Sequence, residues 1–188
     1  MKARSRKPVP AFGHNWPFAM PVQFDQVGSA GAFERTNQMA RFIFVPGGWH
    51  GGWTFDAVSK MLSNEGHEVQ ALTLSGLGNE LSTGVNLEHH IDEVVQAIRW
   101  RDTRAVLVGH SYGGMVITGA ADKESSRVEA IIYADAYVPD NGASVWSLTT
   151  QPYRERFIAG VAADGLNCAH DIPRLAPEAL TKILLQYV

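Results

Sequence analysis

The sequence predicts an α/β fold in which a mostly parallel sheet carries helices on both faces. Short apolar strands alternate with amphipathic helical stretches from residue 41 onward, and this order is typical of parallel sheets. The strands are apolar on both faces, as in Ala105-Val106-Leu107-Val108, which indicates burial between two helical layers. Turn residues such as Pro46-Gly47-Gly48 separate the elements.

The expected elements divide the chain into three parts. Strands are expected at 42–45, 68–74, 105–108 and 128–133, and helices at 54–64, at 87–98 after the cap Asn86, and from 113 onward. After Pro139, the stretches 144–149, 154–163 and 177–188 look helical, with no strand between them. We therefore expect an irregular N-terminal arm (1–40), a core (41–142) and a helical cap segment (143–188) over one end of the sheet. The arm is either a dispensable leader or packs its aromatic residues on the core.

The composition excludes several classes of protein. The 188 residues carry a net charge of -3, so neither a nucleic acid nor an anionic membrane would attract the chain. The single cysteine, Cys168, cannot form an internal disulfide. No apolar run approaches the roughly 18 residues of a membrane span. The basic stretch 1–7 is not followed by the apolar segment of a signal peptide, so we expect a cytoplasmic protein.

The strongest functional signal is Gly-His-Ser-Tyr-Gly at 109–113, between an apolar strand and a helix. A serine on such a sharp strand-to-helix turn projects its hydroxyl beyond the carboxyl end of the sheet, and the flanking glycines allow the tight turn. The helix that follows directs its partially positive amino terminus at the same place. We therefore predict that Ser111 is a catalytic nucleophile. The alternative is an ordinary glycine-rich turn.

A second glycine-rich stretch, Pro-Gly-Gly-Trp-His-Gly-Gly at 46–52, follows the first strand. Acyl transfer builds negative charge on a carbonyl oxygen, and backbone N–H groups that already point at this oxygen stabilise it. We expect these donors of the oxyanion hole to be the N–H of Tyr112, directly after the nucleophile, and the N–H of Gly48. The alternative is a phosphate-binding loop, but the spacing fits neither common glycine motif of nucleotide-binding proteins.

These motifs resemble those of the α/β-hydrolases close to plant methylesterases and hydroxynitrile lyases, and bacterial esterases of that group are especially similar. The resemblance covers about 41–142 and includes Thr-Leu-Ser-Gly-Leu-Gly at 73–78 and Tyr-Ala-Asp-Ala-Tyr-Val-Pro at 133–139. It implies a carboxylesterase that acts on small esters without a cofactor or metal, with a helical cap that shapes the substrate pocket. It also implies an acid and a histidine on two further strands beyond the cap.

This chain shows no such strands, so we expect it either to be truncated relative to the family or to have a shortened design. His170, in the cap segment, is the only histidine after the nucleophile and is a candidate replacement base. His50 belongs to the glycine-rich loop and is expected to shape the pocket. Asp135 follows the fourth strand and is either a catalytic acid or a structural carboxylate. His89 and His90 are expected to be solvated on a helix.

Two other functions stay open at this point. One is a non-catalytic ligand-binding remnant of the fold, and the other is a hydroxynitrile lyase that uses the same serine. The missing strands would expose an edge of the sheet, which favours a homodimer. The expected partner of the esterase is a small-molecule ester.

Overall fold

The structure is a computed structural model that describes residues 39–78, 84–155, 173 and 176–187. Its centre is a four-stranded parallel sheet in the order β2-β1-β3-β4. The strands are β1 (Arg41–Val45), β2 (Glu68–Ala71), β3 (Ala105–Ser111) and β4 (Val128–Ala136). The predicted parallel α/β arrangement is therefore confirmed. Nearly all of the predicted arm (1–40) lies outside the described residues.

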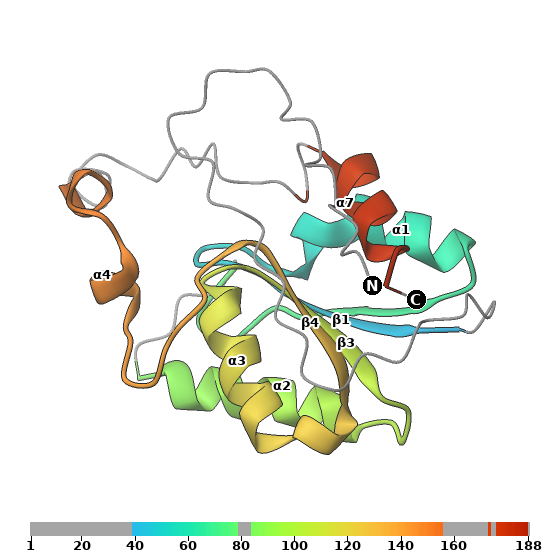
Figure 1. Cartoon of the computed structure of the whole chain (residues 1–188), viewed down its shortest axis with the longest axis horizontal. Coiled ribbons are helices and arrows are strands. Elements are labelled where there is room, and N and C mark those ends of the chain that lie inside the picture. The colour runs from blue at the N-terminus through green and yellow to red at the C-terminus, as the bar shows by residue number, and fades with distance from the viewer. Residues whose placement is uncertain (1–38, 79–83, 156–172, 174–175, 188) are drawn as a thin grey trace, which may run out of the picture.

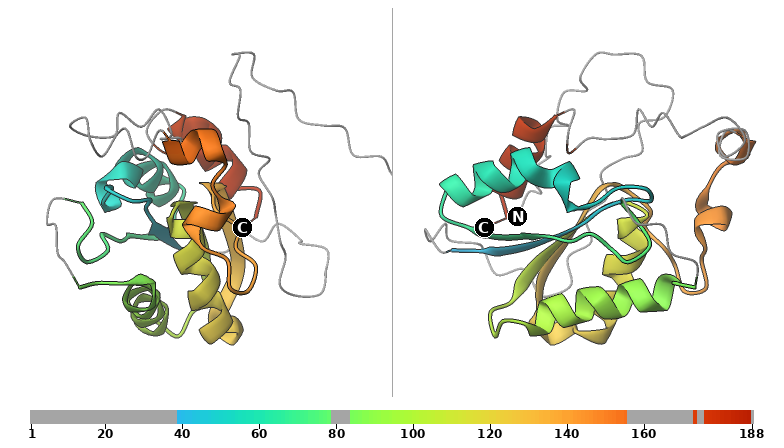
Figure 2. Two further views of the ribbon diagram at one scale, coloured as in Figure 1. Left: turned by 90° about the vertical axis from the view of Figure 1, so that its left-hand side faces the viewer. Right: turned by 180° about the vertical axis from the view of Figure 1, so that it is seen from behind.

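Helices cover both faces of the sheet (Figure 1). One face carries α2 (Leu87–Arg99) and α3 (Gly113–Lys123), and the other carries α1 (Asp56–Asn64) and α7 (Pro177–Leu184), as Figure 2 shows from two further directions. Two short 3-10 helices, η1 (Gly52–Phe55) and η2 (Ser125–Arg127), precede α1 and β4. The four-residue helix α4 (Val145–Leu148) lies near the end of the sheet at which β1 and β3 finish (Figure 1).

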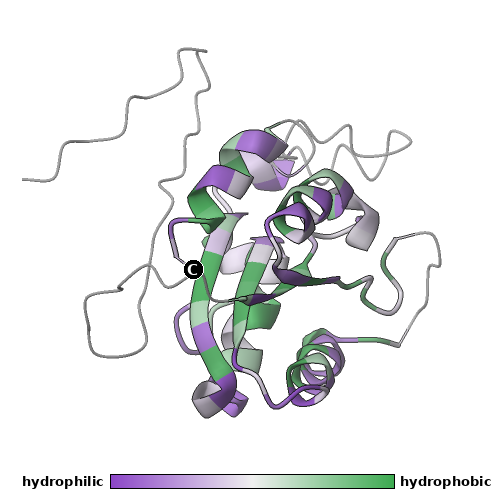
Figure 3. Ribbon diagram, turned by 90° about the vertical axis from the view of Figure 1, so that its right-hand side faces the viewer, coloured by the Kyte–Doolittle hydropathy of each residue, from purple (hydrophilic) through white to green (hydrophobic). Residues whose placement is uncertain are grey.

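Alternate residues of each strand pack into two separate cores, because successive side chains of a strand point to opposite faces. On β1, Ile43 and Val45 face the core beneath α2 and α3. Phe42 and Phe44 face the core beneath α1 and α7. The ribbon of the central strands is largely hydrophobic, whereas the helices carry residues of both kinds (Figure 3). The sheet is thus a rigid base that holds the loops at its carboxyl end.

Some elements differ from their predicted bounds. The second strand ends at Ala71 rather than at residue 74, because η1 closes over its end: a Cβ on Gly52 would lie 2.7 Å from the carbonyl oxygen of Ala71. The N–H of Gly52 also donates to the Thr73 hydroxyl at 2.8 Å, which draws the chain out of the sheet. Asn86 is confirmed as the cap of α2, since its side chain accepts from the N–H of His89 at 3.0 Å.

The predicted cap segment (143–188) is described only in part. Residues 151–155 are helical, and 156–172 lie outside the described residues. α7 packs beside α1, where the Thr181 hydroxyl donates to the Met61 sulfur at 3.5 Å, so α7 belongs to a helical layer of the sheet. That this segment caps the site stays a prediction. Among the described residues, no helix is both long and apolar enough to span a bilayer, and the cytoplasmic location also stays a prediction.

A buried arginine joins the sheet to the end of α2. Arg41, at the start of β1, is 3% exposed and donates to the backbone carbonyls of Ala97 and of Ile98, the latter at 3.1 Å. Carbonyls in the last turn of a helix have no partner within that helix. Burial lowers the pKa of Arg41, and Glu68, 3.9 Å away, opposes that shift. The guanidinium stays charged, so it binds the end of α2 as a cation.

We expect Arg41→Met to lower the free energy of unfolding by about 2–4 kcal/mol, because it leaves buried carbonyls without a donor. Urea denaturation measures this loss. The matched control is Arg101→Met: Arg101 lies 3.3 Å from the same Glu68, but its side chain is 56% exposed. Exposed ion pairs contribute less than about 1 kcal/mol. Equal losses for the two variants would contradict the role assigned to Arg41.

Candidate active site

Ser111 stands at a sharp turn between a strand and a helix. It is the last residue of β3, Tyr112 already has helical dihedral angles, and α3 begins at Gly113. The φ of Ser111 is 53°, in the left-handed region that non-glycine residues rarely adopt. Such strained backbone persists only where the surrounding structure enforces it, and it is concentrated at functional sites. The predicted strand–turn–helix context of the motif is therefore present.

Two glycines allow this turn to pack against its neighbours. A Cβ on Gly113 would lie 2.2 Å from the carbonyl oxygen of Val45, the last residue of β1. A Cβ on Gly109 would lie 2.8 Å from the carbonyl oxygen of Gly113, at the start of α3. Both distances are too short for any side chain. The turn therefore approaches β1 and α3 more closely than any other residue type would permit.

The predicted oxyanion loop borders the Ser111 side chain. β1 and β3 are paired with Val45 opposite Gly109, so the segments that follow them emerge side by side at the carboxyl end of the sheet. A Cβ on Gly47 would lie 2.7 Å from the Ser111 Cβ and 3.2 Å from its Oγ. No atom lies within 4 Å of the corresponding position on Gly48. The structure thus brings the 46–52 loop and the serine together and leaves space beside Gly48.

A β-turn sets the direction of the Gly48 N–H. The His50 N–H donates to the Gly47 carbonyl at 3.3 Å, and Trp49 has a φ of 62°. Gly48 itself has no positive φ, so 47–50 form a type II turn. A trans peptide is planar, and its N–H points opposite to its C=O. The bond from His50 to the Gly47 carbonyl therefore fixes the N–H of Gly48 on the other side of that peptide.

The Tyr112 N–H is oriented in the same way. The Tyr137 N–H donates to the Ser111 carbonyl at 3.0 Å, and this carbonyl shares a peptide with the N–H of Tyr112. A β-bulge makes the bond possible: His110 pairs with Ala134 and Ser111 with Ala136, so Asp135 is the additional residue of β4. Asp135 has a φ of 51° and is half-buried. Its place beside the turn is thus explained by the backbone, whichever role its carboxylate has.

The other predicted site residues lie in different surroundings. The His50 Nδ1 lies 2.8 Å from the Gly48 carbonyl, and since a carbonyl only accepts, Nδ1 is the donor. The His50 ring also packs against Trp53 and His110, so it braces the loop. His170 lies outside the described residues. Within the described part of the chain, no group of three or more His, Cys, Asp or Glu side chains could hold a metal ion.

The prediction that His90 is solvated is wrong. His90 is 4% exposed, and its ring lies 2.9 Å from the Tyr112 hydroxyl and 2.8 Å from the Ser75 carbonyl oxygen. Its neighbour His89 is the exposed one and lies 3.2 Å from Glu93. The helical spacing contained the signal, because His90 precedes the buried residue Val94 by four positions and so shares its face. The two adjacent histidines therefore lie on different faces of α2, and only His89 is solvated.

The arrangement suits the stabilisation of an anion next to a serine hydroxyl. The N–H groups of Gly48 and Tyr112 belong to the segments that meet at Ser111. The carbonyl of each of these two peptides is fixed by a hydrogen bond. The amino terminus of α3 adds the partial positive charge of its unsatisfied N–H groups. An oxyanion formed by attack of a serine on a carbonyl needs donors that are already oriented before the reaction. The geometry is therefore better explained by a site for acyl transfer than by an ordinary glycine-rich turn.

Comparisons with known proteins agree with this geometry. The sequence profile of the alpha/beta hydrolase family matches residues 42–183. The chain is 38% identical to a carbendazim-hydrolysing esterase of Nocardioides sp. over 137 residues, which are 69% of this chain and 57% of that protein. It is 31% identical to salicylic acid-binding protein 2 of Nicotiana tabacum over 121 residues, which are 61% of this chain and 46% of that protein. The chain thus spans about half the length of these relatives.

A solved structure gives the same result. An extracellular α/β-hydrolase from a Paenibacillus species, described as sharing structural and functional homology with tobacco salicylic acid-binding protein 2, matches with a TM-score of 0.60 and 27% identity. The match covers 66% of this chain and 52% of that one. The predicted resemblance is therefore confirmed, and the chain belongs to the alpha/beta hydrolase family.

Proposed function

We propose that the protein is a carboxylesterase that acts on small esters through Ser111. The Ser111 Oγ attacks the ester carbonyl and loses its proton to a base, which gives a tetrahedral oxyanion. The N–H groups of Gly48 and Tyr112 stabilise this oxyanion. The alcohol then leaves with a proton, and water releases the acid from the acyl-enzyme. The observation that carries the proposal is the approach of Gly47 to the Ser111 side chain, which supports a role of the 46–52 loop in the reaction.

The substrate class is supported by the relatives. They include an esterase from Nocardioides sp. and a methylesterase from Arabidopsis thaliana. The base of the proposed reaction is a histidine, for which His170 stays the candidate. A serine hydrolase that lacks part of its triad still keeps roughly 10³–10⁴-fold catalysis over water, from its oxyanion hole and substrate binding. Slow turnover by this chain would therefore still support the proposal, provided that it depends on Ser111.

We expect a fluorophosphonate probe to modify Ser111, because the oxyanion hole stabilises the developing charge on the phosphoryl oxygen as the serine attacks phosphorus and fluoride leaves. Intact-mass and peptide-mapping spectrometry measure the modification. Ser111→Ala should remove it, and Ser125→Ala, at an exposed serine in η2, should retain it. If both variants and the parent chain react equally, Ser111 is not an activated nucleophile.

The non-catalytic alternative predicts a different outcome in a second assay. If the chain is only a ligand-binding remnant, the parent and Ser111→Ala should hydrolyse p-nitrophenyl acetate at equal rates. Loss of hydrolysis in Ser111→Ala supports the esterase instead. A lyase that uses the same serine would cleave a cyanohydrin faster than an ester, and a direct comparison of the two substrates distinguishes these activities.

We expect Gly48→Pro to slow ester hydrolysis by about 10²–10³-fold relative to Gly48→Ala, because only proline removes the N–H donor. Gly48 is the second residue of a type II turn, where proline is favoured, and the space beside it is open. Both variants should therefore fold. Steady-state kinetics measure the difference, and equal rates for the two variants would remove Gly48 from the proposed oxyanion hole.

The predicted homodimer also stays a proposal, and the edge of the sheet supports it. β4 has nine residues, pairs with β3 on one side, and has no strand on its other side within the described part of the chain. A long edge strand is a template for pairing with another chain. We expect the sedimentation coefficient to rise with protein concentration towards that of a dimer. A monomer at every concentration would contradict the proposed pairing.

A further inference from the structure

One buried side chain of α2 contacts both the nucleophile turn and a loop from the neighbouring strand. The Nδ1 of His90 lies 2.9 Å from the Tyr112 hydroxyl oxygen, and its Nε2 lies 2.8 Å from the Ser75 carbonyl oxygen. The His90 and Tyr112 rings meet edge to face, with centroids 5.7 Å apart. His90 is thereby linked to the side chain of the residue whose backbone N–H is a proposed oxyanion donor.

The two contacts assign the protons of this network. The Ser75 carbonyl can only accept, so the His90 Nε2 carries a proton and donates it. In the neutral ring the Nδ1 then has the lone pair and accepts from the Tyr112 hydroxyl. Burial, with a smaller effect of Glu93, raises the pKa of Tyr112 to about 12. The phenol therefore keeps the proton that this bond requires throughout the neutral range.

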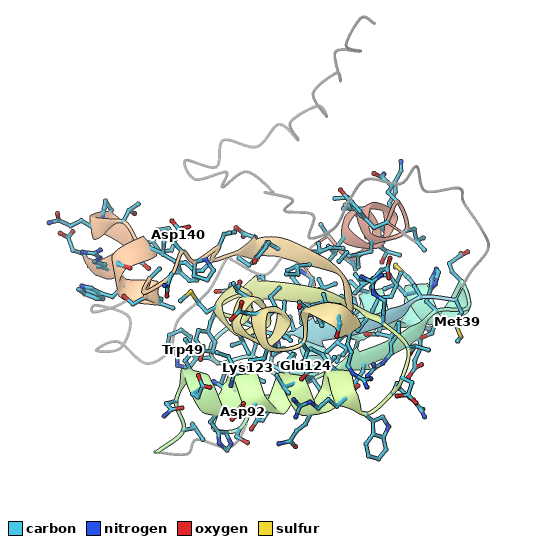
Figure 4. The ribbon with its side chains drawn as sticks, turned by 60° about the horizontal axis from the view of Figure 1, so that its bottom comes forward. Met39, Trp49, Asp92, Lys123, Glu124 and Asp140 are labelled. Carbon is cyan, nitrogen blue, oxygen red and sulfur yellow. The ribbon has the colours of Figure 1, made fainter. Side chains whose placement is uncertain are left out.

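His90 is itself held firmly, because α2 and α3 are in close contact. A Cβ on Gly119 of α3 would lie 2.4 Å from the Ile91 Cδ1, so the glycine lets the Ile91 side chain pack directly on α3. Lys123 of α3 pairs with Glu88 and, at 2.8 Å, with Asp92 of α2, and Figure 4 shows Lys123 and Asp92 where the two helices meet. The Ile91 contact and the Lys123 ion pairs together hold α2 against α3, and they thereby fix the position of His90 relative to α3.

The loop that His90 contacts is held by the same helix. The Ser75 N–H donates to the Glu93 carboxylate at 3.1 Å, while the Ser75 carbonyl accepts from His90. Glu93 and His90 are three positions apart on α2 and so lie on neighbouring parts of its surface. Both backbone groups of Ser75 are thus bound by α2, and the Tyr112 phenol is bound to the same histidine.

We propose that His90 is a positioning residue for the oxyanion hole, which it serves by anchoring the Tyr112 side chain to α2. This proposal rests on the proposed esterase function. Tyr112 is then held at two points. The Tyr137 N–H donates at 3.0 Å to the Ser111 carbonyl, which shares a peptide with the Tyr112 N–H, and His90 binds the Tyr112 side chain. Small displacements of a group that acts on the reacting atoms reduce rates strongly, since about 1 Å can account for about 10²-fold. Loss of the anchor should therefore slow acylation and change substrate affinity little.

The first test compares two tyrosines whose hydroxyls bond to the helical layer of α2 and α3. Tyr112→Phe removes the bond to His90 and keeps the backbone N–H. The control is Tyr133→Phe, which removes a 2.8 Å bond to Thr118 of α3 that is not part of the proposed site. We expect Tyr112→Phe to slow fluorophosphonate modification of Ser111 roughly 10-fold, and Tyr133→Phe by less than about 2-fold, although each variant loses a partly buried hydrogen bond. Equal rates for Tyr112→Phe and the parent overturn the proposal.

The second test replaces the histidine. A glutamine can donate to Ser75 and accept from Tyr112, whereas a leucine can do neither. His90→Gln should therefore recover most of the rate that His90→Leu loses, and kcat rather than KM should change. Combining His90→Leu with Tyr112→Phe should slow the reaction no further than His90→Leu alone. Fully multiplicative effects of the two substitutions would show that they act independently, against the proposal.

A third measurement does not need a reactive serine. Nitrogen NMR of the parent chain should show His90 with its proton on Nε2, and Tyr112→Phe should shift the Nδ1 resonance. His90→Leu should lower the NMR order parameter of the backbone amide of residue 112, because the residue loses its side-chain anchor, and Tyr133→Phe should not. If Ser111 proves unreactive while these signals behave as expected, the esterase proposal fails and the anchor stands. An Nδ1-protonated His90, or an order parameter at residue 112 that His90→Leu leaves unchanged, overturns the anchor itself.

Discussion

The left-handed backbone at Ser111 is the constraint on which the rest of the site depends. A φ of 53° is unfavourable for serine, and close contacts around the turn hold it. Gly113 packs against the Val45 carbonyl, and Gly47 packs against the serine itself. The buried parallel strands supply the rigidity that these contacts require. If the turn relaxed, the hydroxyl would lose its position beside the 46–52 loop, and neither proposed donor would have a target.

The site is built largely from backbone groups. Each proposed N–H donor is oriented by a hydrogen bond to the carbonyl of the same peptide. The Gly47 carbonyl is held by His50 and the Ser111 carbonyl by Tyr137. Peptide planarity transmits both restraints to the N–H groups at 48 and 112. Such donors require no reorganisation when charge develops, which is the basis of electrostatic stabilisation in acyl transfer. Side chains such as His90 contribute by holding this backbone in place.

Local sequence patterns predicted the parts of the structure that local physics decides. The apolar strands, the cap at Asn86 and the turn at 109–113 each have their signal within a few adjacent residues. The bulge at Asp135 has no such signal, because it arises from the register between β3 and β4. The burial of Arg41 depends likewise on the end of α2, far along the chain. His90 could have been found, since its helical spacing places it on the buried face.

The most direct test of the central claim is a crystal structure of the chain with a phosphonyl group on Ser111. The account predicts that Ser111 keeps its positive φ and that one phosphonyl oxygen lies about 2.7–3.1 Å from the backbone nitrogens of both Gly48 and Tyr112. A phosphonyl oxygen directed away from these two nitrogens, or a Ser111 with ordinary strand or helix dihedral angles, would contradict it.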